Sequence, residues 1–444
     1  MKDLSVGKES TIIFRFALPM LIGNVFQQIY TLINSIIVGN FVGKEALAAV
    51  GASFPLIFTL ISLVIGIAIG ATIVIAQYFG AKDMKNVMRA IDTLMVFTLI
   101  ASVIVTIAGI LLSKPIFRLT DLPDDVLPLA VTYFNIYMIG LVFAFGFNSI
   151  SAILRGMGDS KTPLYFLVIS TMLNIGLDFL FVLGFNWGVA GVAWATVISQ
   201  AVALLFAILY LNKTHDIFKI EWRKPAFDRL ILNKSLRIGF PVGFQQAFVA
   251  LSMLAMYWLV NRFGTNVTAA FSVAFRIDSF ASMPAMNFAM ALSAFVGQNL
   301  GANKPERVKH GLWATFYMTS AISVAISLIG IFFAAPLMRL FTNDPEVIAI
   351  GKDYLQIVTG FYIVFSLMFV VGGVMRGAGD TFIPMIITFF SLWVVRIPVG
   401  YFMSESMGYH GIWWCIPIAW VVGLSLSYLY YLTGRWKRKV VIRK

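Results

Sequence analysis

One carboxylate stands alone in a long apolar part of the chain. Between Lys161 and Lys213, Asp178 is the only charged residue, and Asn174 precedes it by four positions. Residues four apart share one face of a helix, so we expect both side chains on one surface. An ionised carboxylate at membrane depth is costly and usually marks an ion path or a binding site. A structural Asp that is hydrogen-bonded inside a helix bundle is the alternative.

The composition indicates a polytopic membrane protein. Of the 444 residues, 60% are hydrophobic and 12% are charged, whereas soluble domains are about 25% charged. The net charge of +13 does not indicate a nucleic-acid partner, because the basic residues fall in short connections between apolar runs. The single Cys415 excludes an internal disulfide, and the three histidines form no metal or protease motif. We therefore expect no enzyme and no cofactor.

The apolar runs predict an all-α integral membrane protein with twelve transmembrane helices, because about 20 apolar residues cross a bilayer. The first six helices are expected near 12–39, 47–76, 88–112, 126–150, 162–184 and 188–211. The second six are expected near 236–261, 267–297, 310–334, 347–373, 382–403 and 410–433.

An internal repeat divides these helices into two sets of six. Arg155-Gly-Met-Gly-Asp159 recurs as Arg376-Gly-Ala-Gly-Asp380, and Gln77-Tyr-Phe-Gly-Ala81 recurs as Gln298-Asn-Leu-Gly-Ala302, both 221 positions later. Further matches in the same register indicate duplication. Because six is an even number, both halves enter the membrane from the same side, as parallel transporter repeats do. A substrate cavity is expected between them.

The repeat predicts three parts of the chain. Residues 1–211 form an N-terminal six-helix lobe, and 236–444 form a C-terminal lobe with a basic tail. Residues 212–235 form a cytoplasmic linker, whose Trp222, Phe227 and Leu230 are expected at the lipid surface.

The distribution of Lys and Arg predicts the orientation. One set of helix ends, including both termini, carries 25 of the 33 basic residues, and the opposite ends carry six. We expect a multi-pass protein of the inner, cytoplasmic membrane with both termini in the cytoplasm. The apolar run after Lys2, Lys8 and Arg15 is too long for a signal peptide and is expected to be the first span.

The chain resembles the multidrug and toxic compound extrusion (MATE) family. The resemblance rests on the two Arg-Gly-x-Gly-Asp loops, on Ala46–Gly51, and on Leu173–Asp178 followed by Gly188–Gln200. It implies a twelve-helix antiporter that exports organic, amphipathic cations in exchange for Na⁺ or H⁺. Two six-helix lobes would alternate between inward-open and outward-open forms.

The closest resemblance is to the DinF-like branch of that family. Its coupling pattern implies Asn34, Asn174, Asp178 and Thr196 as the cation-coupling residues, with Asn148 as a further neighbour. The departure is Asn34, where the branch normally has Asp. Asp178 would then carry the coupling cation alone, with Na⁺ as one candidate and neutral oxygens from Asn174 and Thr196.

Acidic residues expected for the other main branch are missing here. That NorM-like branch uses acids on its seventh and tenth helices, where this chain has Gln245 and no acid between Asp353 and Arg376. The ion site is therefore placed in the first half.

The second half contains three charged residues at membrane depth. Arg276 and Asp278 are two apart and cannot face each other on a helix. Asp278 is therefore expected to form a structural ion pair with Arg396, because an unpaired buried charge is expensive. Contact with substrate is the alternative.

Methionines and aromatic residues of this half are candidates for the substrate cavity, since they suit varied apolar cations. Ordinary packing of membrane helices is the alternative. The candidates are Met256, Met283, Met286, Phe275 and Gln245.

A multidrug antiporter is not the only function considered. A lipid-linked oligosaccharide flippase or polysaccharide exporter would need a more cationic cavity than Arg276 and Arg396 provide. A membrane-embedded enzyme would need clusters of His, Cys or carboxylates. A channel or uniporter would follow if Asp178 were only structural. We expect a monomer whose partners are a small organic substrate and the lipid bilayer.

Overall fold

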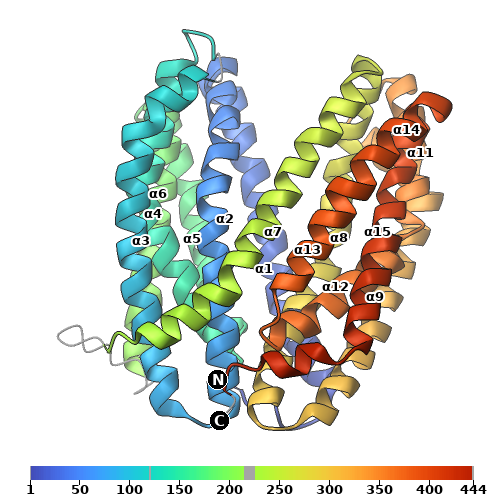
Figure 1. Ribbon diagram of the computed structural model, residues 1–444. Coiled ribbons are helices and arrows are strands. Elements are labelled where there is room, and N and C mark those ends of the chain that lie inside the picture. The colour runs from blue at the N-terminus through green and yellow to red at the C-terminus, as the bar shows by residue number, and fades with distance from the viewer. Residues whose placement is uncertain (1, 120–121, 215–225, 443–444) are drawn as a thin grey trace. The chain divides into compact units, whose positions relative to one another are not determined.

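The computed structural model describes residues 2–119, 122–214 and 226–442, which contain helices and no strand (Figure 1). The first half consists of long helices and two short π-helical segments. These are α1 (Glu9–Ile37), η1 (Val38–Val42), α2 (Lys44–Gly80), α3 (Met84–Leu119), α4 (Leu127–Gly156), α5 (Lys161–Phe179), η2 (Leu180–Gly184) and α6 (Gly188–Thr214).

The second half repeats this order with more interruptions. Its elements are α7 (Arg229–Asn261), α8 (Thr265–Gly301), α9 (Pro305–Phe332), α10 (Ala334–Arg339), α11 (Pro345–Thr359), α12 (Tyr362–Gly377), α13 (Phe382–Phe389), η4 (Phe390–Arg396), α14 (Ile397–Met407), α15 (Tyr409–Leu432) and η5 (Arg435–Lys439).

The helices confirm the predicted all-α membrane fold. Within the described residues, eleven helical segments are long and apolar enough to cross a membrane. The pair α11 and α12, bent by 48° at their break, would make a twelfth span. The sequence predicts one continuous helix over 347–373, whereas the structure breaks it after Thr359, at Gly360 and Phe361.

Helix packing divides the chain into two compact units that differ from the two sequence halves. Unit 1 is built mainly from 22–79 and 83–239, and unit 2 from 3–21, 80–82 and 240–444. The first part of α1 thus belongs to unit 2, and the first part of α7 belongs to unit 1. Pro19 and Pro241 lie within these two helices close to the change, and proline removes one backbone donor there.

The predicted linker, 212–235, is partly helical. Its first residues complete α6, and the residues from Arg229 onward begin α7. Phe227 and Leu230 are exposed, as expected for side chains at a lipid surface. Trp222 lies outside the described residues.

Small residues allow close crossings of the helices inside unit 1. A Cβ atom on Gly70 of α2 would lie 2.4 Å from the carbonyl oxygen of Ser235 in α7. One on Gly239 would lie 2.6 Å from the Cα of Ile67. Larger side chains would therefore separate α2 from α7, as is typical of small residues at membrane helix contacts.

In unit 2, the end of α8 and the beginning of α9 hold the first residues of the chain. The backbone N–H of Leu4 donates to Gln298 Oε1 at 2.8 Å, and Asn299 Nδ2 donates to the Leu4 carbonyl at 3.3 Å. Arg307 donates to the Gly7 carbonyl at 2.7 Å and pairs with Glu9 at 2.9 Å. We call Leu4–Glu9 the N-terminal strap. Its partners include the repeated Gln298–Ala302 motif.

Asp3 lies just before the N-terminal strap and outside the spans. Burial raises the pKa of its carboxyl, but hydrogen bonds from Ser5 and the charges of Lys304 and Lys82 outweigh that effect, so the pKa is lowered. The ionised form of Asp3 is therefore favoured in the folded protein.

In unit 1, α3 holds the segment before α7 in a corresponding way. The backbone N–H of Asp228 donates to Thr93 Oγ1 at 2.9 Å, and that of Ala226 donates to Asp92 Oδ2 at 3.2 Å. Arg89 lies 3.8 Å from the Asp228 carboxylate. The beginning of α3 therefore holds the segment before α7, just as the α8–α9 region holds the segment before α1.

Candidate cation site

The predicted coupling residues of α5 are placed by the loop that precedes this helix. Asp159, the last residue of the first Arg-Gly-x-Gly-Asp motif, accepts hydrogen bonds from the backbone N–H groups of Lys161 and Thr162, both at 3.0 Å. A side-chain acceptor there satisfies donors of the first helical turn. Gly158 has a φ of 81°, which favours glycine. The motif thus starts α5 in a defined register.

Both polar side chains of α5 are buried within unit 1. Asn174 is 2% exposed and Asp178 is 0% exposed. The helix packs on α6, which carries Thr196. Immediately after Phe179 the chain enters η2, and π-helical turns are frequent at functional sites.

A chain of hydrogen bonds joins α1, α5 and α6. Asn34 Nδ2 donates to the Tyr30 hydroxyl at 3.1 Å, and the Tyr30 and Thr196 hydroxyls lie 3.2 Å apart. Because Thr196 Oγ1 donates its one proton to the Val192 carbonyl at 3.1 Å, Tyr30 must be the donor to Thr196. Asn174 Nδ2 also donates to Thr196 Oγ1, at 3.4 Å. The structure therefore brings Asn34, Asn174 and Thr196 together.

This arrangement engages the amide N–H groups in hydrogen bonds but leaves the amide and carboxylate oxygens without partners in the described part of the chain. The amide oxygens of Asn34 and Asn174 and both carboxylate oxygens of Asp178 are buried without a hydrogen-bond partner among the described residues. Leaving one such group unsatisfied costs about 1–3 kcal/mol. Hard cations bind through oxygen ligands, and a proton can bind a carboxylate. The oxygens fit either kind of ligand.

The single carboxylate limits what the site can hold. No group of three or more His, Cys, Asp or Glu side chains suited to a metal ion exists in the part of the chain that the structure describes. A cation at Asp178 would therefore have one anionic ligand and neutral amide oxygens.

Thr196 has no lone pair left for a cation in this arrangement. A hydroxyl oxygen has two acceptor lone pairs, and Tyr30 and Asn174 use both. In this arrangement Thr196 positions the amide of Asn174, and its role as an oxygen ligand of the cation stays a prediction.

The sequence did not single out the tyrosines around this site. Tyr30 and Tyr133 both lie within electrostatic range of the Asp178 carboxylate. Tyr137 is hydrogen-bonded to Gln200. Helical spacing was the available signal, because Tyr30 is four residues before Asn34 and Gln200 is four after Thr196.

Asn148 is placed differently from the other predicted coupling residues. Its side chain is exposed on α4, and its amide donates to the carbonyl of Ala144 in the same helix at 2.8 Å. Its participation in the site stays a prediction.

The acid that lies at membrane depth in unit 2, Asp278, has polar partners. Asp278 of α8 accepts a hydrogen bond from the Tyr362 hydroxyl of α12 and lies within electrostatic range of Arg396. Arg396 is 9% exposed and hydrogen-bonds to the Cys415 side chain, while its Nε has no partner among the described residues. The direct ion pair of Asp278 with Arg396 stays a prediction, and Arg276 is exposed.

The candidates for the substrate cavity differ in accessibility. Met286 is 37% exposed and Phe275 is partly buried, whereas Met283 is 8% exposed and Met256 is fully buried in the unit 2 core. Gln245 donates to Thr388 Oγ1 at 2.6 Å. Met256 therefore has no surface available to a substrate in this structure.

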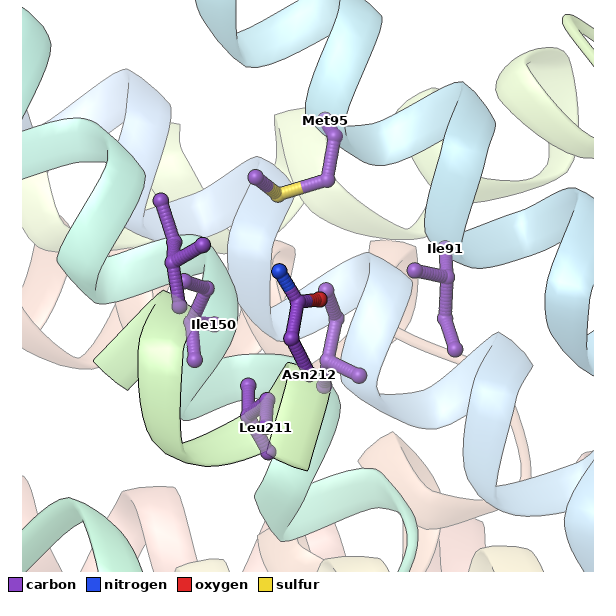
Figure 2. Close-up of a pocket in the computed structure, with 7 residues that line it drawn as sticks. Ile91, Met95, Ile150, Leu211 and Asn212 are labelled. Atoms are coloured by element: carbon purple, nitrogen blue, oxygen red, sulfur yellow. The ribbon is translucent and has the colours of Figure 1, made fainter. Parts of the chain in front are cut away.

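One cavity of unit 1 is too small for an organic compound (Figure 2). Its volume is about 10 Å³, with Asn212 as its polar side chain, among Ile91, Met95, Ile150, Ile153, Ile208 and Leu211. Organic ligands usually occupy pockets of about 300–1,000 Å³. This cavity has room for a single water molecule.

The family comparison detects the same duplication as the sequence repeat. The MatE family model matches residues 19–180 and again residues 241–402. Each half of the chain therefore carries one copy of the family's repeat, which confirms the internal duplication.

Known proteins match nearly the whole chain. A probable multidrug resistance protein of Bacillus subtilis, YpnP, is 33% identical over 98% of this chain and 97% of its own length. Another from the same organism, YoeA, is 33% identical over 96% and 94%. A solved outward-facing structure of a multidrug resistance MATE transporter of the MOP superfamily superimposes with a TM-score of 0.93, at 26% identity, covering 99% of each chain. The chain therefore belongs to the MatE family, whose members are multi-span membrane transporters and not enzymes.

Proposed function

We propose that this protein is a secondary active efflux antiporter that exports organic, amphipathic cations in exchange for Na⁺ or H⁺. The names of its relatives, probable multidrug resistance proteins, support export of small organic compounds. The proposal includes a place in the cytoplasmic membrane with both termini inside, a monomeric state, and closest kinship with the DinF-like branch. The lobes are proposed as the two sequence repeats.

The observation that carries ion coupling is the set of buried, unpartnered oxygens on Asp178, Asn34 and Asn174. Asp178 supplies the charge, and Asn34 and Asn174 each supply one free amide oxygen. The amide N–H groups of Asn34 and Asn174 donate to the hydroxyls of Tyr30 and Thr196, which hold the two amides in place. A Na⁺ ion would use several of these oxygens, whereas a proton needs only one carboxylate oxygen.

Coupling follows from the cost of an uncompensated charge. While the Asp178 carboxylate is bare, it disfavours any state that seals it from water. A bound cation removes that penalty. Exchange results if the cation and the organic compound favour opposite states, since each ligand shifts the equilibrium only by its differential affinity. Met286, Phe275 and Gln245 are the proposed substrate contacts.

The deciding experiment measures dye accumulation in proteoliposomes while Na⁺ and proton gradients are imposed separately. The wild-type protein should concentrate the dye under at least one gradient. Asp178→Asn keeps the shape and removes the charge, so uphill transport should fall at least tenfold. Asp125→Asn changes an exposed acid and serves as the matched control. Full uphill transport by well-folded Asp178→Asn protein would reject this site.

The structure offers no support for the flippase alternative at Arg396. That function would need cationic side chains free to hold phosphates. Arg396 is buried and hydrogen-bonds to Cys415, which leaves Arg276 as the exposed basic residue at membrane depth.

A further inference from the structure

Unit 1 has a second, larger hollow, which we call the Trp187 groove. Its volume is about 370 Å³, within the range of small-molecule sites. It lies where α2, α4 and α6 begin, and its lining includes Glu45, Thr132, Asn186, Trp187 and Gly188. This end of the unit is opposite the α2–α3 turn, and the proposed orientation places it outside the cell.

An aromatic wall forms one side of the groove. The Trp187 ring is stacked on Phe181 at a centroid distance of 4.9 Å and lies 5.5 Å from Phe185. Its side chain is still 50% exposed. The backbone N–H of Trp187 donates to the Phe181 carbonyl at 2.9 Å. The indole ring is therefore held by Phe181 and Phe185, and half of the side chain remains exposed to a ligand.

The turn that presents this ring is conformationally unusual. Asn186 and Gly188, on either side of Trp187, have φ values of 53° and 54°. Asparagine is among the non-glycine residues that adopt the left-handed conformation most readily, so both residues suit the tight turn that presents Trp187. The π-helical segment η2 ends two residues before Asn186.

The groove carries one charged group, the Glu45 carboxylate. Its side chain is 41% exposed, and its basic neighbour Lys44 is 92% exposed and 3.7 Å away. A pair so exposed to water is weak. The negative charge of Glu45 therefore remains available to a cation that enters the groove.

We propose that the Trp187 groove is an additional binding site for an aromatic organic cation. Such a ligand would place its ring against Trp187 and its charge near Glu45, combining cation–π attraction with charge pairing. The proposal deepens the proposed function and rests on it, since the ligand class is that of the exported compound. The groove would hold the compound on the outer side after release.

The second repeat provides an internal comparison. α2 and α8 have the same length, 37 residues, and each follows a glycine of positive φ, Gly43 and Gly264. By this register Glu45 corresponds to Asn266. Gly188 corresponds to Gly408, with a φ of 61°, so Trp187 corresponds to Met407. At these two positions the second repeat has neither the acid nor the indole. The nearby carboxylate of Glu346 already accepts a hydrogen bond from Asn266 Nδ2 at 2.7 Å, so the proposal predicts no matching site there.

Equilibrium dialysis of the full-length protein in detergent against tetraphenylphosphonium tests the proposal without any gradient. Two classes of binding site are expected in the wild type. Glu45→Gln and Trp187→Leu should each weaken one class at least about fivefold, and Trp187→Phe should weaken it less. Glu306→Gln, another exposed acid in the first turn of a helix, is the control that should change nothing. The anion tetraphenylborate should not bind this class.

The Asp178→Asn protein separates this proposal from the transport proposal. Its groove should bind tetraphenylphosphonium as the wild type does, although its uphill transport is lost. If Glu45→Gln and Trp187→Leu both leave binding unchanged, Trp187 only anchors the protein at the membrane interface and the groove proposal is wrong. Loss of groove binding in Asp178→Asn alone would also contradict it.

Discussion

Each unit places one acid at membrane depth, Asp178 or Asp278, and the surroundings of the two acids differ. The carboxylate of Asp178 in unit 1 has both oxygens without a hydrogen-bond partner among the described residues. That of Asp278 in unit 2 accepts the Tyr362 hydroxyl and lies within electrostatic range of Arg396. Buried polar groups are normally satisfied. A bare carboxylate is open to an external ligand, whereas one that accepts a hydrogen bond from a neighbouring helix is tied into the fold.

The largest expected effect separates transport from stability at Asp178. Asp178→Asn should lower gradient-driven transport at least tenfold and leave the thermal unfolding temperature unchanged or higher, because a neutral amide is cheaper to bury than an unpartnered charge. Transport assays in proteoliposomes and melting curves in detergent measure the two effects. A strong loss of stability without loss of coupling would mean that Asp178, like Asp278, stabilises the fold and does not bind the coupling ion.

The reverse pattern is expected at Asp278. Asp278→Asn weakens the interactions with Tyr362 and Arg396, so stability should fall by about 1–3 kcal/mol. Arg396→Gln should also destabilise the protein. The double variant should lose less than the sum, as expected for residues that interact. Strictly additive losses, measured by thermal unfolding, would mean that Arg396 does not compensate Asp278.

Adding a second acid should sharpen the contrast further. Asn34→Asp adds a second carboxylate to the proposed site, and two close carboxylates hold a proton or a Na⁺ ion more tightly than one. The Na⁺ concentration for half-maximal transport should fall, or the pH dependence should move to higher pH. If both profiles match those of the wild type, Asn34 does not belong to the site.

The smallest effects are expected at the residues that position the amides. Thr196→Ala removes the acceptor shared by Tyr30 and Asn174, so coupling should weaken severalfold, and more with Na⁺ than with protons. Thr196→Ser keeps the hydroxyl and should restore coupling. Equal loss in both variants would point to packing by the Thr196 methyl group instead.

The sequence predicts the fold because its signals are long and repeated. Apolar runs of membrane length and motifs 221 positions apart are visible without any contacts. Asp178 and Asn174 are equally visible, because helical spacing places both on one face.

Features that depend on packing between helices could not be predicted in the same way. Tyr30 joins the site only because α1 meets α6 in one rotational register. The Tyr362 hydroxyl reaches Asp278 only through the packing of α12 on α8, and the sequence did not single it out. The repeat pattern of the sequence also does not show that the first part of α1 belongs to unit 2 and the first part of α7 to unit 1.

The N-terminal strap also constrains the order in which the parts of the protein can fold. Leu4 is 2% exposed and binds Gln298 and Asn299, which leave the ribosome roughly 300 residues later. Domains generally fold from the N-terminus as synthesis proceeds, but the first part of α1 must wait for α8 and α9. Leu4–Glu9 and the first part of α1 are thus synthesised long before their partners but reach their final place only after them.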